Sequence, residues 1–266
     1  MSGVESDQMN ASSALRAPGP FLLALEGRAP WEFGATLAAW PILRQAPRGD
    51  GHSIVVFPGL AASDVTTVPL RTFLDNQGYD AHGWKLKFNF GPRKGVLEAS
   101  LERVRRFRRE SGRRVSLVGW SLGGVFAREI AKLLPDDVRC VITLGSPFTG
   151  HPKANNAWRI YQLVSGHRLE DDEAMEHVRK TPPVPTTSIF SRTDGIVAWQ
   201  CCLQGREKQA ESIEVQASHF GIGMHPASWY AVADRLAQPE GAWRPFHREG
   251  WREWLYRDPY RAQDRD

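Results

Sequence analysis

The stretch Val115-Ser116-Leu117-Val118-Gly119-Trp120-Ser121-Leu122-Gly123 decides how this chain folds. Its first half is a run of apolar and β-branched residues typical of a buried strand, and residues 122–134 carry apolar side chains at helical spacing. Gly119 and Gly123 flank Ser121 at positions where a Cβ atom would collide across a sharp turn from strand to helix. We therefore predict that Ser121 stands at a strained turn with its hydroxyl clear of the sheet.

Two other interpretations of this glycine-rich turn are open. In the first interpretation, Ser121 only caps the following helix. In the second the turn would bind phosphate, but no Gly-Lys-Ser or Gly-Lys-Thr stands at the helix start, which argues against it. The pattern Gly-x-Ser-x-Gly alone is weak evidence, whereas its place between a strand and a helix favours a nucleophilic serine.

Strand-like and helix-like segments alternate along the rest of the chain. This alternation predicts an α/β fold, with a mostly parallel central sheet and helices on both faces. Residues 151–185 form an insertion with a helical pattern, which we expect to be a small helical lid; a surface helix and a disordered loop are the other interpretations. Strands are expected at 53–57, 81–86, 115–118, 139–144, 186–191 and 213–216, and helices at 67–77, 96–110, 122–134 and from 226 onward.

The 266 residues divide into three expected parts, of which one is a domain with a large core. Residues 1–50 form a leader, disordered over 1–17, and a helical arm. Residues 51–240 form the α/β domain. Residues 241–266 form an aromatic and basic tail, whose rings we expect to pack against the arm; weak contact of this tail with a membrane surface is a second interpretation.

Composition and charge exclude several classes of protein. No apolar run is long enough to span a bilayer, no secretory signal is visible, and three cysteines do not make a disulfide framework, so we expect a cytoplasmic protein. The net charge of +4 indicates no particular partner, and the arginines of residues 103–109 fit a solvated helix face. No nucleic-acid-binding module is recognisable, and the sequence leaves the oligomeric state open.

A nucleophilic serine needs a base and an acid, which follow it in the order Ser, Asp or Glu, His in proteins with this kind of turn. Asp194 comes directly after the expected strand 186–191, at the sheet edge that carries Ser121. We therefore predict that Asp194 is the acid. Asp171 and Asp172 lie in the insertion and are poorer candidates.

Three histidines follow Asp194, and His219 is the predicted base. It lies on a loop just after the last expected strand, over the same sheet edge. His225 precedes a helix start and is the main competitor, while His247 belongs to the tail.

The negative oxygen of a tetrahedral intermediate requires two hydrogen-bond donors. The backbone N–H groups of Leu60, after the first strand, and of Leu122, after the nucleophile, are the candidates. Apolar side chains near the same edge together predict a pocket for an apolar acyl or alcohol group, although each could equally belong to the ordinary core; they are Trp120, Phe148, Phe220 and Met224.

Several of these segments together resemble the α/β-hydrolase superfamily, in particular its compact bacterial lipases and esterases. The resemblance covers roughly residues 53–238 and rests on Phe57-Pro58-Gly59-Leu60, Gly119-Trp120-Ser121-Leu122-Gly123-Gly124, Gly145-Ser146-Pro147-Phe148, Ser191-Arg192-Thr193-Asp194-Gly195 and Ser218-His219-Phe220-Gly221. It implies hydrolysis of a small-molecule or lipid carboxylic ester through an acyl-enzyme, without a metal or an organic cofactor. Many members carry His-Gly where this chain has Pro58-Gly59, which weakens the link to true lipases.

Two alternatives remain open at this point. An acyltransferase or a thioesterase would use the same three residues, because water and other acceptors meet the same acyl-enzyme. A non-catalytic, membrane-associated binding protein on a hydrolase scaffold is the alternative from another class.

Overall fold

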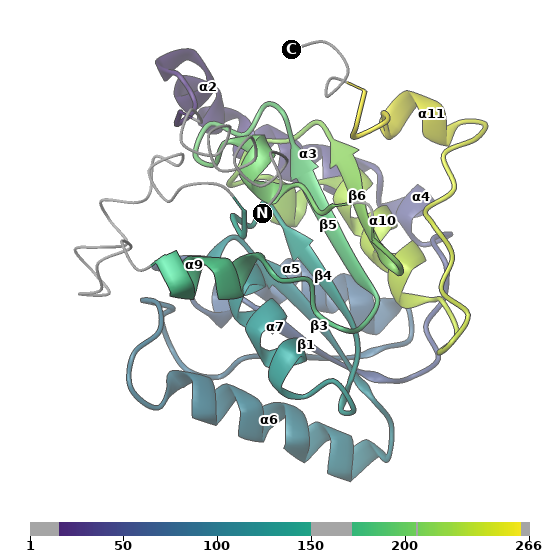
Figure 1. The fold of residues 1–266 in the computed structure, drawn as a ribbon. Helices are drawn as coiled ribbons and strands as arrows, with labels where there is room; N and C mark the ends of the chain where they lie inside the picture. The colour runs from purple at the N-terminus through teal and green to yellow at the C-terminus, as the bar shows by residue number, and fades with distance from the viewer. Residues whose placement is uncertain (1–15, 150–171, 206, 262–266) are drawn as a thin grey trace.

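The computed structural model describes residues 16–149, 172–205 and 207–261. Six strands form one parallel sheet in the order β2-β1-β3-β4-β5-β6 (Figure 1). This sheet confirms the predicted fold class. The strands are β1 Ser53–Phe57, β2 Asp80–Gly83, β3 Val115–Trp120, β4 Val138–Leu144, β5 Thr186–Ser191 and β6 Ala210–Val215.

The strand order determines which loops meet at the carboxyl ends of the strands. From β1 the chain first moves outward to β2 and then returns to β3 on the other side of β1. Helices leaving two neighbouring strands on opposite faces open a crevice at the carboxyl ends of those strands. Phe57 at the end of β1 pairs with Gly119 near the end of β3, so the loop after β1 and the turn at Ser121 are neighbours.

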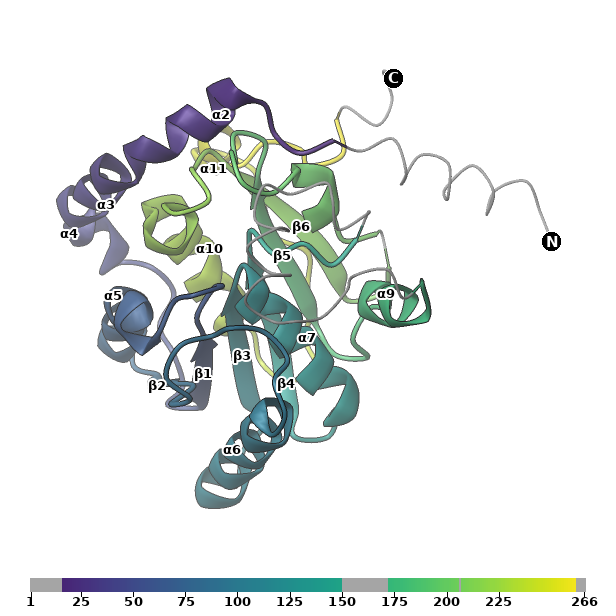
Figure 2. The ribbon, with the colours of Figure 1, turned by 90° about the vertical axis from the view of Figure 1, so that its left-hand side faces the viewer.

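Helices cover both faces of the sheet (Figure 2). One face carries α5 (Asp64–Asn76) and α10 (Pro226–Leu236), and the other carries α6 (Val96–Ser111) and α7 (Leu122–Leu133). Alternate residues of each strand pack toward opposite helix layers, as Val55 and Val56 do in β1. The central strands are therefore buried on both faces, which explains their continuous apolar runs.

Strands β2 and β6 differ most from their expected bounds, whereas β3 ends two residues later and β4 begins one residue earlier than expected. β2 ends at Gly83 because the next two backbone N–H groups, of Trp84 and Lys85, donate to the carboxylate of Asp64 instead of continuing the ladder. β6 begins at Ala210, earlier than expected, because its glutamates are buried against arginines. Glu211 lies 2.7 Å from Arg235, and this pairing lets a charged residue occupy an interior strand position.

The N-terminal arm comprises residues 16–46 and contains α2 (Pro20–Ala24), η1 (Leu25–Arg28), α3 (Ala29–Ala38) and α4 (Trp40–Leu43). Its Trp40 ring packs edge-on against Trp229 of α10 and Phe73 of α5. Figure 2 shows the arm along the outside of α10, from α2 near the carboxyl ends of the strands to α4 near α5. The arm is therefore part of the helical layer on that face.

The tail packs differently from our expectation. Its rings at Trp251 and Tyr256, on either side of the short helix α11 (Arg252–Leu255), contact Tyr230 of α10, and Tyr256 also contacts Phe246. Arm and tail thus share α10 as a support, and the ring contacts described for the tail do not involve the arm. Sequence periodicity could not choose between these two aromatic surfaces.

Parts of the expected leader and lid lie outside the described residues. These include residues 1–15 and most of the insertion, with Trp158. Of the insertion, α9 (Asp172–Arg179) is described, and the carbonyl of its His177 accepts a hydrogen bond from Lys132 of α7 at 2.6 Å. No helix in the described part of the chain has the length and apolar character needed to cross a bilayer.

Candidate active site

Ser121 occupies the turn between β3 and α7. Its backbone has φ 53° and ψ −123°, a conformation that L residues rarely adopt and that lifts the side chain off the sheet. The crossing is tight: a Cβ atom on Gly119 would lie 2.3 Å from the Cα of Gly124, and one on Gly123 would lie 2.4 Å from the carbonyl oxygen of Phe57. Glycine is therefore required on both sides of Ser121, for the reason the sequence pattern indicated.

A continuous chain of hydrogen bonds joins the three predicted residues. His219 Nε2 lies 2.9 Å from Ser121 Oγ, and His219 Nδ1 lies 2.7 Å from Asp194 Oδ2. Asp194 and His219 are buried, while Ser121 is partly exposed. With Nδ1–H donated to Asp194, the Nε2 lone pair faces the serine hydroxyl, which is the arrangement that general-base activation of a serine requires.

The orientation of Asp194 is fixed by its own loop. Its Oδ1 accepts hydrogen bonds from the backbone N–H groups of Ile196 at 2.8 Å and Val197 at 2.7 Å. The other oxygen is left to face His219. The loop after β5 thus holds the Asp194 carboxylate in place through its own backbone.

The surroundings of His219 favour its protonated form. Burial disfavours the imidazolium, but the negative charge of Asp194, the hydrogen bond to it and the charge of Glu26 outweigh burial and raise the pKa of His219 above its ordinary value. A base with a raised pKa accepts a proton from serine more readily. It must also be deprotonated before the reaction begins.

The competing candidates lie elsewhere. His225 caps α10, because its Nδ1 accepts from the N–H of Ala227 at 3.3 Å. His247 is exposed and pairs with Glu249. Asp172 begins α9, and Asp171 lies outside the described residues.

The loop after β1 lies directly against the serine. A Cβ atom on Gly59 would come within 3.3 Å of Ser121 Cβ, so the residue that follows, Leu60, is close to Ser121. Within the described part of the chain, the backbone N–H groups of Leu60 and Leu122 donate no hydrogen bond to another protein group. Leu122 also begins a helix, whose aligned peptide dipoles favour negative charge.

Sequence analysis missed Asn89, which supports this loop. Asn89 is fully buried; its Nδ2 donates to the Pro58 carbonyl at 2.7 Å, and its backbone exchanges hydrogen bonds with Ala61 and Ala62. The loop that carries Leu60 is thus held from outside its own sequence. An asparagine in an irregular segment gave no local signal of this role.

The four predicted pocket residues have different environments. Phe220 is 52% exposed beside the His219 ring. Trp120 is mostly buried and its indole N–H donates to the carbonyl of His219 at 3.1 Å. Met224 is partly buried against the core, and Phe148 is buried with its ring 3.7 Å from the Arg128 guanidinium. Substrate contact by these residues stays a prediction.

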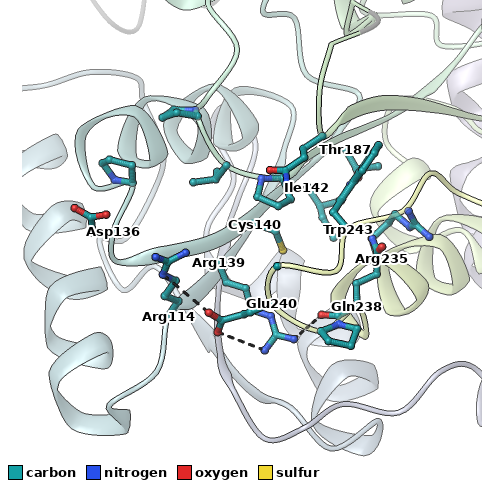
Figure 3. A pocket seen from close by; sticks show the side chains of 17 residues that line it. Arg114, Asp136, Arg139, Cys140, Ile142, Thr187, Arg235, Gln238, Glu240 and Trp243 are labelled. Carbon is teal, nitrogen blue, oxygen red and sulfur yellow. Dashed lines mark hydrogen bonds and ion pairs between the residues drawn. The ribbon is translucent and has the colours of Figure 1, made fainter.

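A separate cavity of about 310 Å³ lies at the opposite edge of the sheet. Figure 3 shows Glu240 between the guanidinium groups of Arg114 and Arg139, with the Cys140 side chain close to Arg139. None of the three hydrogen-bonded residues of the candidate site lines this cavity. It is therefore distinct from the site at Ser121.

The sequence of the domain matches a known family. A model of the family described as serine hydrolase (FSH1) matches residues 58–220, more than half of the chain. The chain belongs to this serine hydrolase family. The match includes Ser121, Asp194 and His219, but begins after the arm and ends before α10.

Solved structures share the fold at low sequence identity. Aspergillus fumigatus lipase B superposes with a TM-score of 0.54 at 17% identity, covering 72% of this chain and 54% of the lipase. A Bacillus licheniformis lipase in its propeptide form gives 0.52 at 18%, covering 76% and 53%. Paleococcus ferrophilus monoacylglycerol lipase gives 0.50 at 16%, covering 71% and 96%. The likeness shows an α/β-hydrolase fold, and this chain spans about half of the Aspergillus lipase; no match was found among curated proteins.

Proposed function

We propose that this serine hydrolase cleaves carboxylic esters through an acyl-enzyme on Ser121. The observation that carries the proposal is the hydrogen-bonded chain Ser121–His219–Asp194, with Ser121 at a strained turn beside two backbone N–H groups that donate to no group among the described residues. Each part of this arrangement matches a requirement of acyl transfer.

In the proposed acylation step, Ser121 Oγ attacks the ester carbonyl carbon while His219 Nε2 takes the hydroxyl proton. The carbonyl oxygen becomes an oxyanion and accepts hydrogen bonds from the N–H groups of Leu60 and Leu122. Collapse of the intermediate breaks the bond to the alcohol, which leaves with the proton from His219. Water then attacks the acyl-enzyme by the same steps and releases the acid.

An apolar ester is the substrate class that the surroundings of His219 favour. The ring of Phe220 lies against the ring of His219 and is 52% exposed. An exposed aromatic ring beside a reaction centre suits an aliphatic or aromatic group better than a phosphate.

A labelling experiment tests the nucleophile, and a substrate series tests the ester class. A fluorophosphonate probe should modify the wild-type protein but not S121A, and hydrolysis of p-nitrophenyl esters of increasing acyl length should reveal the pocket depth. Absence of labelling in the folded wild type would refute the assignment of Ser121. Product analysis with an added alcohol or thiol distinguishes hydrolysis from acyl transfer, because both begin from the same acyl-enzyme.

A further inference from the structure

We propose that Glu26 of the N-terminal arm is a positioning residue for the triad, holding the loop of the acid and the loop of the base with one carboxylate. The inference rests on the proposed function, since it assigns Glu26 a part in the reaction of Ser121. It extends the working site to a segment that lies outside the residues matched by the family.

The contacts of Glu26 reach both loops. Its Oε1 accepts hydrogen bonds from the backbone N–H of Gly195 at 2.7 Å and of His219 at 2.8 Å, and its Oε2 accepts from Phe220 N–H at 3.0 Å. Gly195 is the neighbour of Asp194, so the carboxylate touches the residue next to the acid and the backbone of the base itself. All three donors are N–H groups and Glu26 is only 6% exposed, which makes these bonds strong and costly to lose.

Neighbouring arm residues make related but narrower contacts. Glu32 accepts from the backbone N–H of Ser218 at 2.8 Å and from its hydroxyl at 2.5 Å, whereas Arg28 donates to the Thr193 side chain at 2.7 Å and pairs with Glu32. Each of these side chains binds one of the two catalytic loops. Glu26 differs because a single side chain joins them.

The loops are shaped to receive the arm. A Cβ atom on Gly195 would lie 2.2 Å from the carbonyl oxygen of Leu22, and one on Gly221 would lie 1.6 Å from the Glu32 carboxylate. A Cβ atom on Gly221 would also lie 2.7 Å from Ser218 Oγ of its own loop. Gly195 therefore makes room for the arm backbone, and Gly221 for both the arm and its own loop.

The negative charge of Glu26 also supports His219 as a base, in addition to the hydrogen bonds that position the two loops. Burial lowers the pKa of His219, whereas Asp194 and, to a smaller extent, Glu26 raise it. Other charged groups on the arm are Glu32 and its ion-pair partner Arg28, which also act on His225, and the Cys202 thiol lies near Asp194. When His219 takes the serine proton, Glu26 stabilises the resulting positive charge.

The decisive variant is E26Q, in which one oxygen becomes an amide nitrogen that faces a backbone donor and the charge is lost. We expect kcat/KM for a short p-nitrophenyl ester to fall about 10- to 100-fold. We also expect the pKa of His219, followed by NMR of the labelled imidazole, to decrease together with the acid limb of the pH–rate profile. E32Q should lower the rate less and leave this pKa unchanged, and E102Q, at an exposed α6 position paired with Arg109, controls for loss of a glutamate.

A wild-type rate with a wild-type His219 pKa in folded E26Q overturns the proposal. A merely structural role would reduce the folded fraction without moving that pKa. If E26Q does not fold, E26D keeps the charge but is one methylene too short to bind all three donors, and a wild-type rate in E26D refutes positioning. The NMR titration does not require turnover, so failure of wild-type labelling would refute the proposed function and leave the effect of Glu26 measurable.

Discussion

Two Asp–His–Ser arrays lie at opposite edges of the same sheet. At the carboxyl edge, Asp194, His219 and Ser121 are joined by contacts of 2.7 and 2.9 Å. At the other edge, Asp50 Oδ1 lies 2.5 Å from His52 Nδ1, and His52 Nε2 lies 2.7 Å from Ser116 Oγ. The second array is at least as short as the first, so distance alone does not distinguish a reactive serine from a structural one.

The two serines differ in backbone and access. Ser116 sits within β3, is fully buried and also accepts a contact from the Cys140 thiol. Ser121 is partly exposed, stands at a positive φ and begins a helix. Of the two serines, only Ser121 is accessible to a substrate and lies beside donors for an oxyanion.

The two histidines differ in the charges around them. His219 faces Asp194 and Glu26, which raise its pKa against the effect of burial. Burial lowers the pKa of His52, and the charges of Arg139 and Arg113 add to this effect against the pull of Asp50. The proposed base, His219, lies among carboxylates, whereas the one carboxylate beside His52 is offset by two arginines.

The largest expected contrast is between the two serines. S121A should lower kcat/KM by about 10⁴-fold or more, because it removes the nucleophile. S116A should keep the rate within a small factor but reduce the free energy of unfolding by about 1–3 kcal/mol, because it leaves a buried ring nitrogen of His52 without its partner. Ester hydrolysis and urea denaturation of both variants test this, and equal loss of activity would remove the distinction.

The next largest contrast in activity is expected between variants of the two aspartates, Asp194 and Asp50. D194N should lower kcat by about 10³- to 10⁴-fold, since an amide no longer holds the correct His219 tautomer. D50N, matched in chemistry, should change the rate little because its histidine does not contact Ser121. A large loss of kcat in folded D50N would show that the second array affects the reaction.

The pH dependence should follow His219 alone. Because the base must be neutral, kcat/KM should fall about tenfold per pH unit below the His219 pKa, with a midpoint above the ordinary value of 6.5. H52Q should leave that midpoint in place. A midpoint at or below 6.5 in wild type would contradict the electrostatics described for the site.

The smallest effect concerns stability. Because the folded-state pKa of His52 lies below its unfolded value, its contribution is complete above about pH 6.5 and is lost as the pH falls toward the lowered folded value. H52Q should therefore lose less stability than wild type between pH 7.5 and 5. Both proteins contain His219, whose contribution has the opposite sign, so the difference between their denaturation curves isolates His52.

The sequence contained enough information for the sheet and for the location of the candidate triad. Gly119, Gly123 and the flanking strand and helix mark Ser121 locally, and the order of the strands brings Asp194 and His219 to the same edge. Glu26 gave no such signal, because its partners lie 169 and 193 residues away and a single glutamate in a helical segment is typical of a solvated surface. Contacts of this kind depend on how the arm packs, which local patterns do not specify.

The placement of the arm on Gly195 has an evolutionary consequence. The three atoms that a Cβ atom on Gly195 would meet first belong to the backbone of Leu22 and Leu23, whereas a Cβ atom on Gly221 would also collide with Ser218 of its own loop. Selection on Gly195 should therefore depend on the arm: homologues that retain the arm should retain this glycine, and homologues without it should be free to replace it. The arm and Gly195 should be gained and lost together as one inherited unit.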